Sequence, residues 1–156
     1  MKTTDQLIIS LLRENSRMTL TNMSKKTKIP VSTLHEKLKQ FKQGLIKKHT
    51  SIIDFNQLGF NARANVLFKV ERKQKEELKE ILQANFHTNK LYKVNNGFDY
   101  IAELIFKDMR DLENFLDEIK SDFNMEDMKT FYVIDELIEE DFLSKYSPLF
   151  SSILSK

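Results

Sequence analysis

The sequence predicts an α+β protein with three helices in its first 50 residues and a ferredoxin-like domain after them. Three observations support this fold class. Apolar residues recur at helical spacing near the N-terminus, the later elements follow the order βαββαβ, and only three glycines and two prolines interrupt the pattern. With 40% hydrophobic and 31% charged residues, the 156-residue chain can build one or two small cores.

Two helices are expected before residue 30, and the second of them is short. Thr4 or Asp5 can cap the first helix, and Thr19 or Thr21 can open the second. The segment Lys28-Ile29-Pro30 ends the second helix, because proline lacks the backbone N–H that a helix needs. The inner face of the first helix carries four apolar residues at helical spacing: Leu7, Ile8, Leu11 and Leu12.

A third helix is expected over Val31–Gln43. Its residues Leu34, Leu38 and Phe41 stand at i, i+4 and i+7, so they form one apolar stripe. These three helices define a first domain, residues 1–50.

A linker follows the three helices. The segment Leu45–Phe55 changes to a strand-like pattern, and Asn56–Gly59 has the composition of a turn. We therefore expect a linker strand and hinge at residues 51–60.

The second domain, residues 61–137, has the βαββαβ order of a four-stranded antiparallel sheet with two helices. A hairpin turn at Asn96-Gly97 separates its second and third strands. The expected strands are Ala62–Val70, Lys90–Asn95, Phe98–Phe106 and Lys129–Leu137, and the expected helices are Lys73–Phe86 and Met109–Phe123.

The C-terminal extension, residues 138–156, is harder to interpret. Ser147-Pro148 suits the start of a helix, and Leu149, Phe150, Ile153 and Leu154 would follow on one face. We expect a short amphipathic helix that packs on the sheet or on a partner subunit.

The charge is unevenly distributed along the chain. Residues 1–50 carry eleven basic against three acidic residues, whereas residues 99–156 carry six against fifteen. A basic first domain favours a polyanionic partner, although a solvated basic surface would give the same count.

Several classes of protein are excluded by composition. The chain has no cysteine, so disulfides, thiol catalysis and cysteine zinc sites are absent. No apolar run approaches the ~20 residues of a membrane-spanning helix, and the N-terminus has no signal-peptide pattern. We expect a cytoplasmic protein that has no membrane partner, metal or cofactor.

Residues 23–46 resemble a winged-type helix-turn-helix domain, and the whole of residues 3–137 resembles the Lrp/AsnC (feast/famine) regulators of bacteria and archaea. No single motif is specific to the family, and the resemblance rests on the order and spacing of five motifs along the chain. They are Asp5, Ser32-Thr33, Gly44-Leu45-Ile46, Leu58-Gly59 and Gly97-Phe98-Asp99.

Two positions depart from the family pattern. Lys28 stands where the turn usually has a small residue or Gly, and Ser24 replaces the usual Ala of the second helix. A non-glycine residue with positive φ costs on the order of 1 kcal/mol, so the turn itself is expected to differ.

The resemblance implies binding of double-stranded DNA through the third helix. Short polar groups at its N-terminal end can reach base edges, and lysines can contact phosphates. The expected base-reading residues are Ser32, Thr33, Glu36, Lys37 and Gln40, and the expected phosphate contacts are Lys25, Lys26, Lys28, Lys47 and Lys48.

For the second domain, the resemblance implies assembly and ligand sensing. The sheets would pair face to face into dimers, which family members often assemble into octamers, and we expect this to bury Val66, Phe68, Leu104 and Phe106. An amino acid or other metabolite would bind near Gly97 and Asp99, with Asp99 holding its ammonium; a simple tight turn is the competing interpretation.

Two alternatives remain at this stage. Siroheme decarboxylases share the two-domain architecture, but they depend on histidines in the second domain, where this chain has only His87. The other alternative is a protein-interaction module without DNA binding. No catalytic triad or carboxylate pair can be assembled from the sequence, so no enzyme is expected.

Overall fold

The computed structural model describes residues 3–144, which form two compact units. The N-terminal unit combines the described residues up to Ile52 with those from Leu137 onward, and the C-terminal unit is Ile53–Glu136. The helix expected after Ser147 lies outside the described residues. No helix within residues 3–144 is long and apolar enough to cross a membrane.

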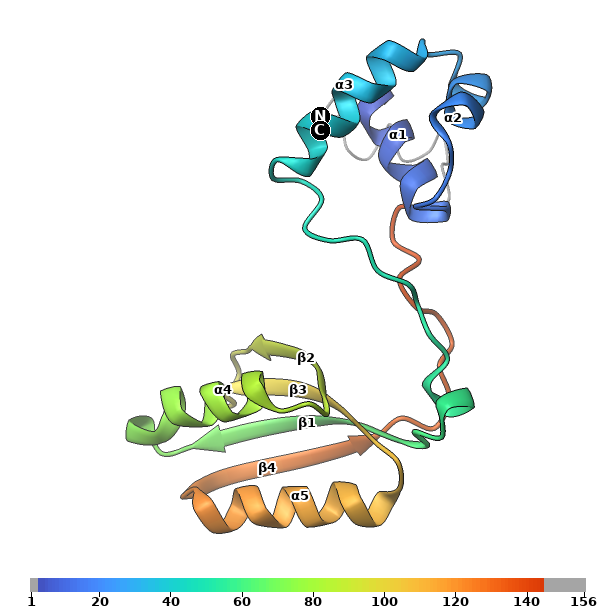
Figure 1. The fold of residues 1–156 in the computed structure, drawn as a ribbon. Helices are drawn as coiled ribbons and strands as arrows, with labels where there is room; N and C mark the ends of the chain where they lie inside the picture. The colour runs from blue at the N-terminus through green and yellow to red at the C-terminus, as the bar shows by residue number, and fades with distance from the viewer. Residues whose placement is uncertain (1–2, 145–156) are drawn as a thin grey trace. The chain divides into compact units, whose positions relative to one another are not determined.

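Three helices form the N-terminal unit: α1 (Thr3–Glu14), α2 (Leu20–Thr27) and α3 (Val31–Lys42) (Figure 1). Their core is apolar and contains Ile8, Leu11, Met23, Leu34 and Phe41. The helical periodicity therefore marks the buried stripe of α3 correctly and that of α1 in part, because Leu7 of the expected inner face is not in this core.

The expected linker strand is wrong. Residues 46–54 form no strand within the described chain, and residues 55–58 instead form a short 3₁₀ helix, η1 (Phe55–Leu58). Asp54 caps η1 by accepting a hydrogen bond from the Asn56 N–H, and Gly59 ends it at φ 84°. A strand needs a hydrogen-bonding neighbour, and the sheet of the described chain consists of β1–β4 alone, so residues 46–54 pair with none of its strands.

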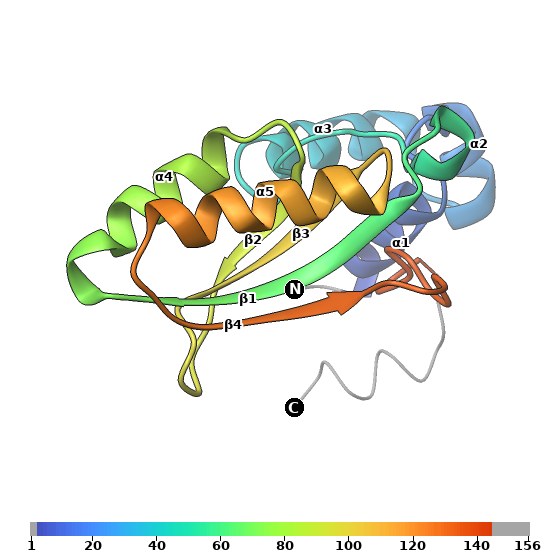
Figure 2. The same ribbon diagram turned by 90° about the horizontal axis from the view of Figure 1, so that it is seen from below.

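The C-terminal unit has the predicted βαββαβ order, and its antiparallel sheet has the strand order β2-β3-β1-β4. Figure 2 shows the two helices lying along one face of this sheet. The strands are β1 (Ala62–Val70), β2 (Thr88–Lys93), β3 (Tyr100–Phe106) and β4 (Met125–Tyr132), and the helices are α4 (Lys75–Ala84), preceded by the 3₁₀ turn η2 (Arg72–Gln74), and α5 (Met109–Asp122).

The last strand begins and ends earlier than predicted. Its partner β1 starts at Ala62, and Tyr132 already lies opposite Ala64, so the ladder ends within two residues of Tyr132. Residues 125–127 include two acidic side chains, which are rare in strands, but they extend β4 because Asp127 pairs with Lys69 and Met125 pairs with Val70 of β1.

The two faces of the sheet differ. On β1, residues with even numbers are buried under α4 and α5, whereas Arg63, Asn65, Leu67 and Lys69 lie on the face that no helix of the C-terminal unit covers. We call this second face the open face. It also carries Ile101, Glu103 and Ile105 of β3, which pair with β1 residues of the same face.

The residues expected to pair subunits are on the wrong face. Val66, Phe68, Leu104 and Phe106 are all under 5% exposed, because they pack against α4 and α5 inside the core of the C-terminal unit. Two amphipathic helices need an apolar sheet face of their own, and these four side chains supply it.

Candidate nucleic-acid interface and ligand-binding residues

A set of local hydrogen bonds fixes the turn between α2 and α3. The Ser24 hydroxyl donates to the Ile29 carbonyl (2.6 Å), and the Thr27 hydroxyl donates to the Met23 carbonyl (2.8 Å) and accepts from the Ile29 N–H (3.2 Å). Ser24 therefore has a use that alanine would lack, because its hydroxyl ties the end of α2 to the turn.

The turn keeps its left-handed residue without a glycine. Lys28 adopts φ 60° and ψ 18°, and its N–H donates to the Ser24 carbonyl. The expectation that the turn would differ is therefore wrong: the lysine accepts the strained conformation, and its side chain stays exposed.

We expect Lys28→Gly to raise the free energy of unfolding of the N-terminal unit by about 0.5–1 kcal/mol, since glycine removes the Cβ strain at positive φ. The same change removes one exposed cation and should flatten the salt dependence of DNA binding by about one unit if Lys28 contacts a phosphate. Thermal unfolding and binding titrations at several salt concentrations measure the two effects. Lys28→Ala is the control, because it removes the charge and keeps the strain.

Four of the five expected base-reading residues form one exposed polar surface on α3. Ser32, Thr33, Glu36 and Gln40 are exposed, while Leu34 and Phe41 of the same helix are buried in the core. The Glu36 carboxylate lies 3.6 Å from the Nδ1 of His35, and both side chains are largely solvent-accessible. The first turn of α3 thus presents small hydroxyl groups to solvent.

Lys37, in contrast, is part of the helix packing. Its ammonium lies 2.8 Å from the carboxylate of Asp5 on α1, and both side chains are mostly buried. This ion pair joins α3 to α1. Asp5, expected only near the start of α1, therefore positions the third helix.

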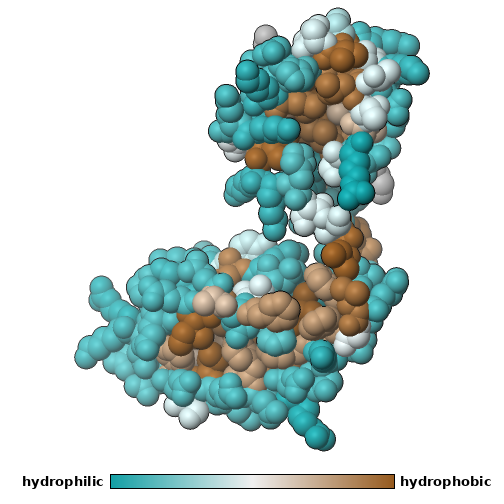
Figure 3. Space-filling model, in the orientation of Figure 1, coloured by the Kyte–Doolittle hydropathy of each residue, from teal (hydrophilic) through white to brown (hydrophobic). Residues whose placement is uncertain are grey.

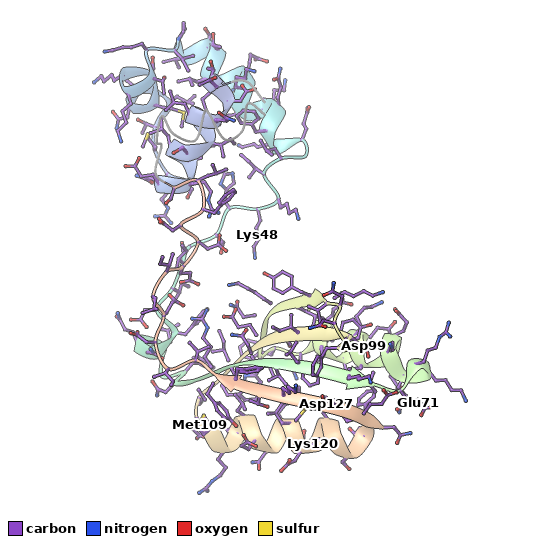
Figure 4. The ribbon with its side chains drawn as sticks, turned by 180° about the vertical axis from the view of Figure 1, so that it is seen from behind. Lys48, Glu71, Asp99, Met109, Lys120 and Asp127 are labelled. Atoms are coloured by element: carbon purple, nitrogen blue, oxygen red, sulfur yellow. The ribbon has the colours of Figure 1, made fainter. Side chains whose placement is uncertain are left out.

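The expected phosphate contacts all remain exposed: Lys25, Lys26, Lys28, Lys47 and Lys48. Lys26 lies 3.5 Å from Glu14 at the end of α1. Figure 4 shows Lys48 on the extended segment that follows α3. These lysines come from α2, from the turn after it and from the start of the connecting segment.

In the C-terminal unit, Asp99 is already engaged. Its carboxylate accepts from the Val70 N–H (3.2 Å) and from Lys75 at the start of α4, and its backbone N–H donates to the Phe68 carbonyl (2.8 Å) (Figure 4). Gly97 adopts φ 90°, where a side chain would be strained. Asp99 thus helps to hold the β2–β3 turn against β1, and Gly97 provides the positive φ of that turn.

A half-open apolar cleft of about 250 Å³ lies elsewhere in this unit. Within the described residues, the buried Thr88 hydroxyl at its wall has no hydrogen-bond partner. Figure 3 shows that apolar surface reaches solvent among hydrophilic side chains on this unit. The cleft is lined by Phe55, Leu58, Phe60, Phe86, His87, Thr88, Asn89 and Ile105.

A charged cluster on the open face escaped the sequence analysis. Glu103 is only 6% exposed; it accepts from Arg63 Nε (2.6 Å) and Asn89 (2.7 Å), and Lys90 lies 3.4 Å away. Arg63 also pairs with Glu136. We call Arg63, Asn89, Lys90, Glu103 and Glu136 the open-face cluster.

The ionisation of the open-face cluster follows from these contacts. Burial opposes the charge on Glu103, but hydrogen bonds from Arg63 and Asn89 and the nearby positive charges outweigh it, so the pKa of Glu103 is lowered. Burial likewise opposes the charge on Arg63, and its bonds to Glu136 and Glu103 raise its pKa. The alternation of side chains along β1 could have predicted that Arg63 lies on the open face. The sequence offers no signal that Arg63 pairs with Glu103, which lies 40 residues away.

The three histidines are divided between the two units. His35 and His49 belong to the N-terminal unit and His87 to the C-terminal unit. The His87 ring stacks on Phe106, with centroids 3.9 Å apart, and its Nδ1 is 2.8 Å from the Ile105 carbonyl oxygen. Among residues 3–144, no three His, Asp or Glu side chains are placed to hold a metal ion.

Two family models match the chain. The Lrp/AsnC ligand binding domain matches residues 63–142, and a winged helix-turn-helix DNA-binding domain matches residues 1–47. This chain is 30% identical to HTH-type transcriptional regulator FL11 of Pyrococcus furiosus and 31% identical to FL11 of Pyrococcus horikoshii. Each match covers 83% of this chain and 87% of the relative.

Solved structures with this fold are similar over nearly the whole chain. Transcriptional regulator NMB0573 of Neisseria meningitidis, in complex with L-Met, superposes with a TM-score of 0.82 at 19% identity, over 89% of this chain and 93% of that one. Bacillus subtilis LrpC superposes with a TM-score of 0.81 at 21% identity, over 88% and 97%.

Proposed function

Since the chain belongs to the Lrp/AsnC family of DNA-binding transcriptional regulators with a ligand-binding domain, we propose that it binds double-stranded DNA as a dimer, with the first turns of α3 in the major groove. The similar proteins are transcriptional regulators rather than enzymes. We place its activity in the cytoplasm, where its DNA is.

The exposed polar surface of α3 carries this proposal. Ser32 and Thr33 offer short hydroxyls at the N-terminal end of a helix whose opposite face is locked into the core by Leu34 and Phe41. Glu36 and Gln40 continue the same surface for a further turn. Such a surface suits base edges, because the short hydroxyls of Ser32 and Thr33 can donate or accept hydrogen bonds and the longer side chains of Glu36 and Gln40 extend the polar surface.

The exposed lysines support a matching role in phosphate binding. Lys25, Lys26 and Lys28 precede α3 and Lys47 and Lys48 follow it, so cations flank the proposed reading helix on both sides in sequence. Phosphate contacts of this kind set affinity and register rather than sequence preference.

We propose that the dimer forms through the open face of the sheet. At its centre, Leu67 of β1 lies opposite Ile101 of β3, and both side chains are only partly buried. Tyr92 and Phe131 on the flanking strands are 58% and 56% exposed. A second copy would cover this apolar area by a two-fold, self-complementary contact.

For the ligand, we propose a small metabolite, with amino acids as the first class to test because the Neisseria regulator was solved with L-Met. A ligand ammonium at Asp99 would have to share the carboxylate with Lys75 or displace it. Titration calorimetry with the twenty amino acids tests this, and a ligand whose affinity is unchanged by Asp99→Asn binds elsewhere.

The DNA proposal is tested on a duplex selected from random DNA by the wild-type protein. We expect Thr33→Ala to weaken binding to the selected duplex by about 1–3 kcal/mol and to leave binding to random duplex unchanged. Lys48→Ala should weaken both equally and lower the salt slope by about one. Fluorescence anisotropy measures both effects.

The control is Lys120→Ala, which removes the same charge from α5 (Figure 4). If Thr33→Ala and Lys48→Ala bind both duplexes as tightly as this control does, α3 is not the reading helix.

A further inference from the structure

The chain crosses between its two units twice. It leaves the N-terminal unit after Ile52 and returns to it at Leu137, five residues beyond the end of β4. Residues 137–144 therefore belong to the unit formed by the first three helices, although they follow the last strand of the other unit directly.

Arg13 in the last turn of α1 holds this returning segment. Its Nε donates to the Phe142 carbonyl (3.0 Å), one terminal nitrogen donates to the Glu140 carboxylate (3.0 Å) and the other donates to the Glu140 carbonyl. One guanidinium thus uses all three of its nitrogens on two residues that lie more than 125 positions away in sequence. A planar fork of donors fixes both distance and orientation, which a lysine could not do.

The backbone of the segment is folded around this side chain. Glu140 and Leu143 adopt positive φ, 49° and 62°, which costs a residue with a side chain on the order of 1 kcal/mol. Ser144 closes the turn with its N–H and hydroxyl, which lie 3.1 and 2.8 Å from the Asp141 carbonyl. Such strained residues persist only where surrounding contacts hold them.

Apolar burial supplies few of those contacts. Leu137, Ile138 and Phe142 are 86%, 77% and 71% exposed and Leu143 is partly buried, so little apolar area is removed from water when the segment returns. The hydrogen bonds of Arg13 attach Glu140 and Phe142 directly to the last turn of α1.

We propose that residues 137–144 are a latch, closed by Arg13, which gives the DNA-binding unit a second tether to the ligand-binding domain. With the latch closed, α1 is joined to the end of β4 by the seven residues 133–139, in addition to the connection from α3 to β1. The latch limits the freedom that the unit must lose when it docks on DNA, so opening it weakens DNA binding. This consequence rests on the proposed function; the latch itself does not.

Arg17 provides a matched control. It lies on the same unit, is exposed, and has no side-chain contact among those described, so Arg13→Gln and Arg17→Gln remove the same charge while only the first opens the latch. In hydrogen exchange on the free full-length protein, we expect amides 140–144 to exchange at least tenfold faster in Arg13→Gln than in Arg17→Gln. Equal rates in the two variants would overturn the latch.

Binding to DNA gives the second readout. We expect Arg13→Gln to bind three- to tenfold more weakly than Arg17→Gln. Glu140→Ala separates the latch from charge alone: loss of a carboxylate favours DNA electrostatically, whereas an open latch weakens binding, so tighter binding by Glu140→Ala would overturn the tethering role. If no variant, including wild type, binds DNA, the proposed function fails, while the exchange result still decides the latch.

Discussion

Phe68→Ala is expected to lower the free energy of unfolding of the C-terminal unit by about 3–5 kcal/mol. The Phe68 side chain is fully buried on the face of β1 that α4 and α5 cover, together with Val66, Leu104 and Phe106. Removing the ring leaves a cavity that these neighbours fill only in part. Chemical denaturation followed by circular dichroism measures the loss.

The matched variant is Leu67→Asp, one residue earlier on the same strand. Leu67 points to the open face, so its replacement should spare most of the stability of the single domain and instead prevent the proposed dimer. Analytical ultracentrifugation should show a folded monomer. If Leu67→Asp remains a dimer, the subunits do not pair through the open face; if Phe68→Ala unfolds like wild type, the assignment of the two faces is wrong.

This pair of variants also shows where sequence reasoning succeeded and failed in the sheet. Alternation along Ala62–Val70 identifies two sets of residues, because successive side chains of a strand point to opposite faces. It does not say which set meets the helices and which meets a partner. From the sequence, we expect Val66 and Phe68 to face a partner subunit. Instead, these two side chains pack against the apolar residues of α4 and α5, which are Leu78, Leu82, Leu112 and Leu116.

Helix α3 shows a similar limit. The stripe of Leu34 and Phe41 correctly separates the buried side of α3 from the exposed side that carries Ser32 and Thr33. Lys37 stands at the border between the two sides, and helical spacing cannot show that Asp5 of α1 lies 2.8 Å from it. Pairings between elements depend on packing angles that a one-dimensional pattern does not contain.

The two segments between the units were the least predictable part of the chain. Residues 45–55 have the apolar and β-branched composition of a strand, but composition alone cannot supply the neighbouring strand that the backbone needs. Residues 140 and 142 are bonded by Arg13, whose position in the last turn of α1 looks like an ordinary favourable helix end. The ends of β4 differ from the prediction because they depend on where its partner β1 begins and ends, which the sequence of β4 alone does not contain.

The open-face cluster joins stability to assembly, because it lies on the same face as Leu67 and Ile101. Arg63 and Glu103 face each other obliquely across β1 and β3, and Glu103 is nearly inaccessible to solvent even without a second copy. A buried carboxylate depends on its partners far more than an exposed one does, because removing a partner leaves a charge that water cannot reach.

Arg63→Ala is therefore expected to destabilise the C-terminal unit by about 2–3 kcal/mol near neutral pH, less than a fully buried pair would lose, since Lys90 and Asn89 still face Glu103. Lys69→Ala is the control. Lys69 pairs across the sheet with Glu126 at 2.9 Å, but both side chains are over 40% exposed and screened by water, so Lys69→Ala should destabilise the unit far less than Arg63→Ala does. Both variants are compared in the Leu67→Asp background, so that dissociation of a dimer does not enter the measured free energy.

The same cluster sets a pH dependence. The pKa of Glu103 in the folded protein lies below its ordinary value, so ionised Glu103 contributes its full stability above the ordinary range and loses it as pH falls through the lowered pKa. We expect the wild-type domain to lose stability on acidification below about pH 5, and Glu103→Gln to lose less over the same interval. Denaturation curves collected between pH 7 and pH 3 test this, and parallel losses in the two proteins would show that the ion pair with Arg63 does not stabilise the sheet.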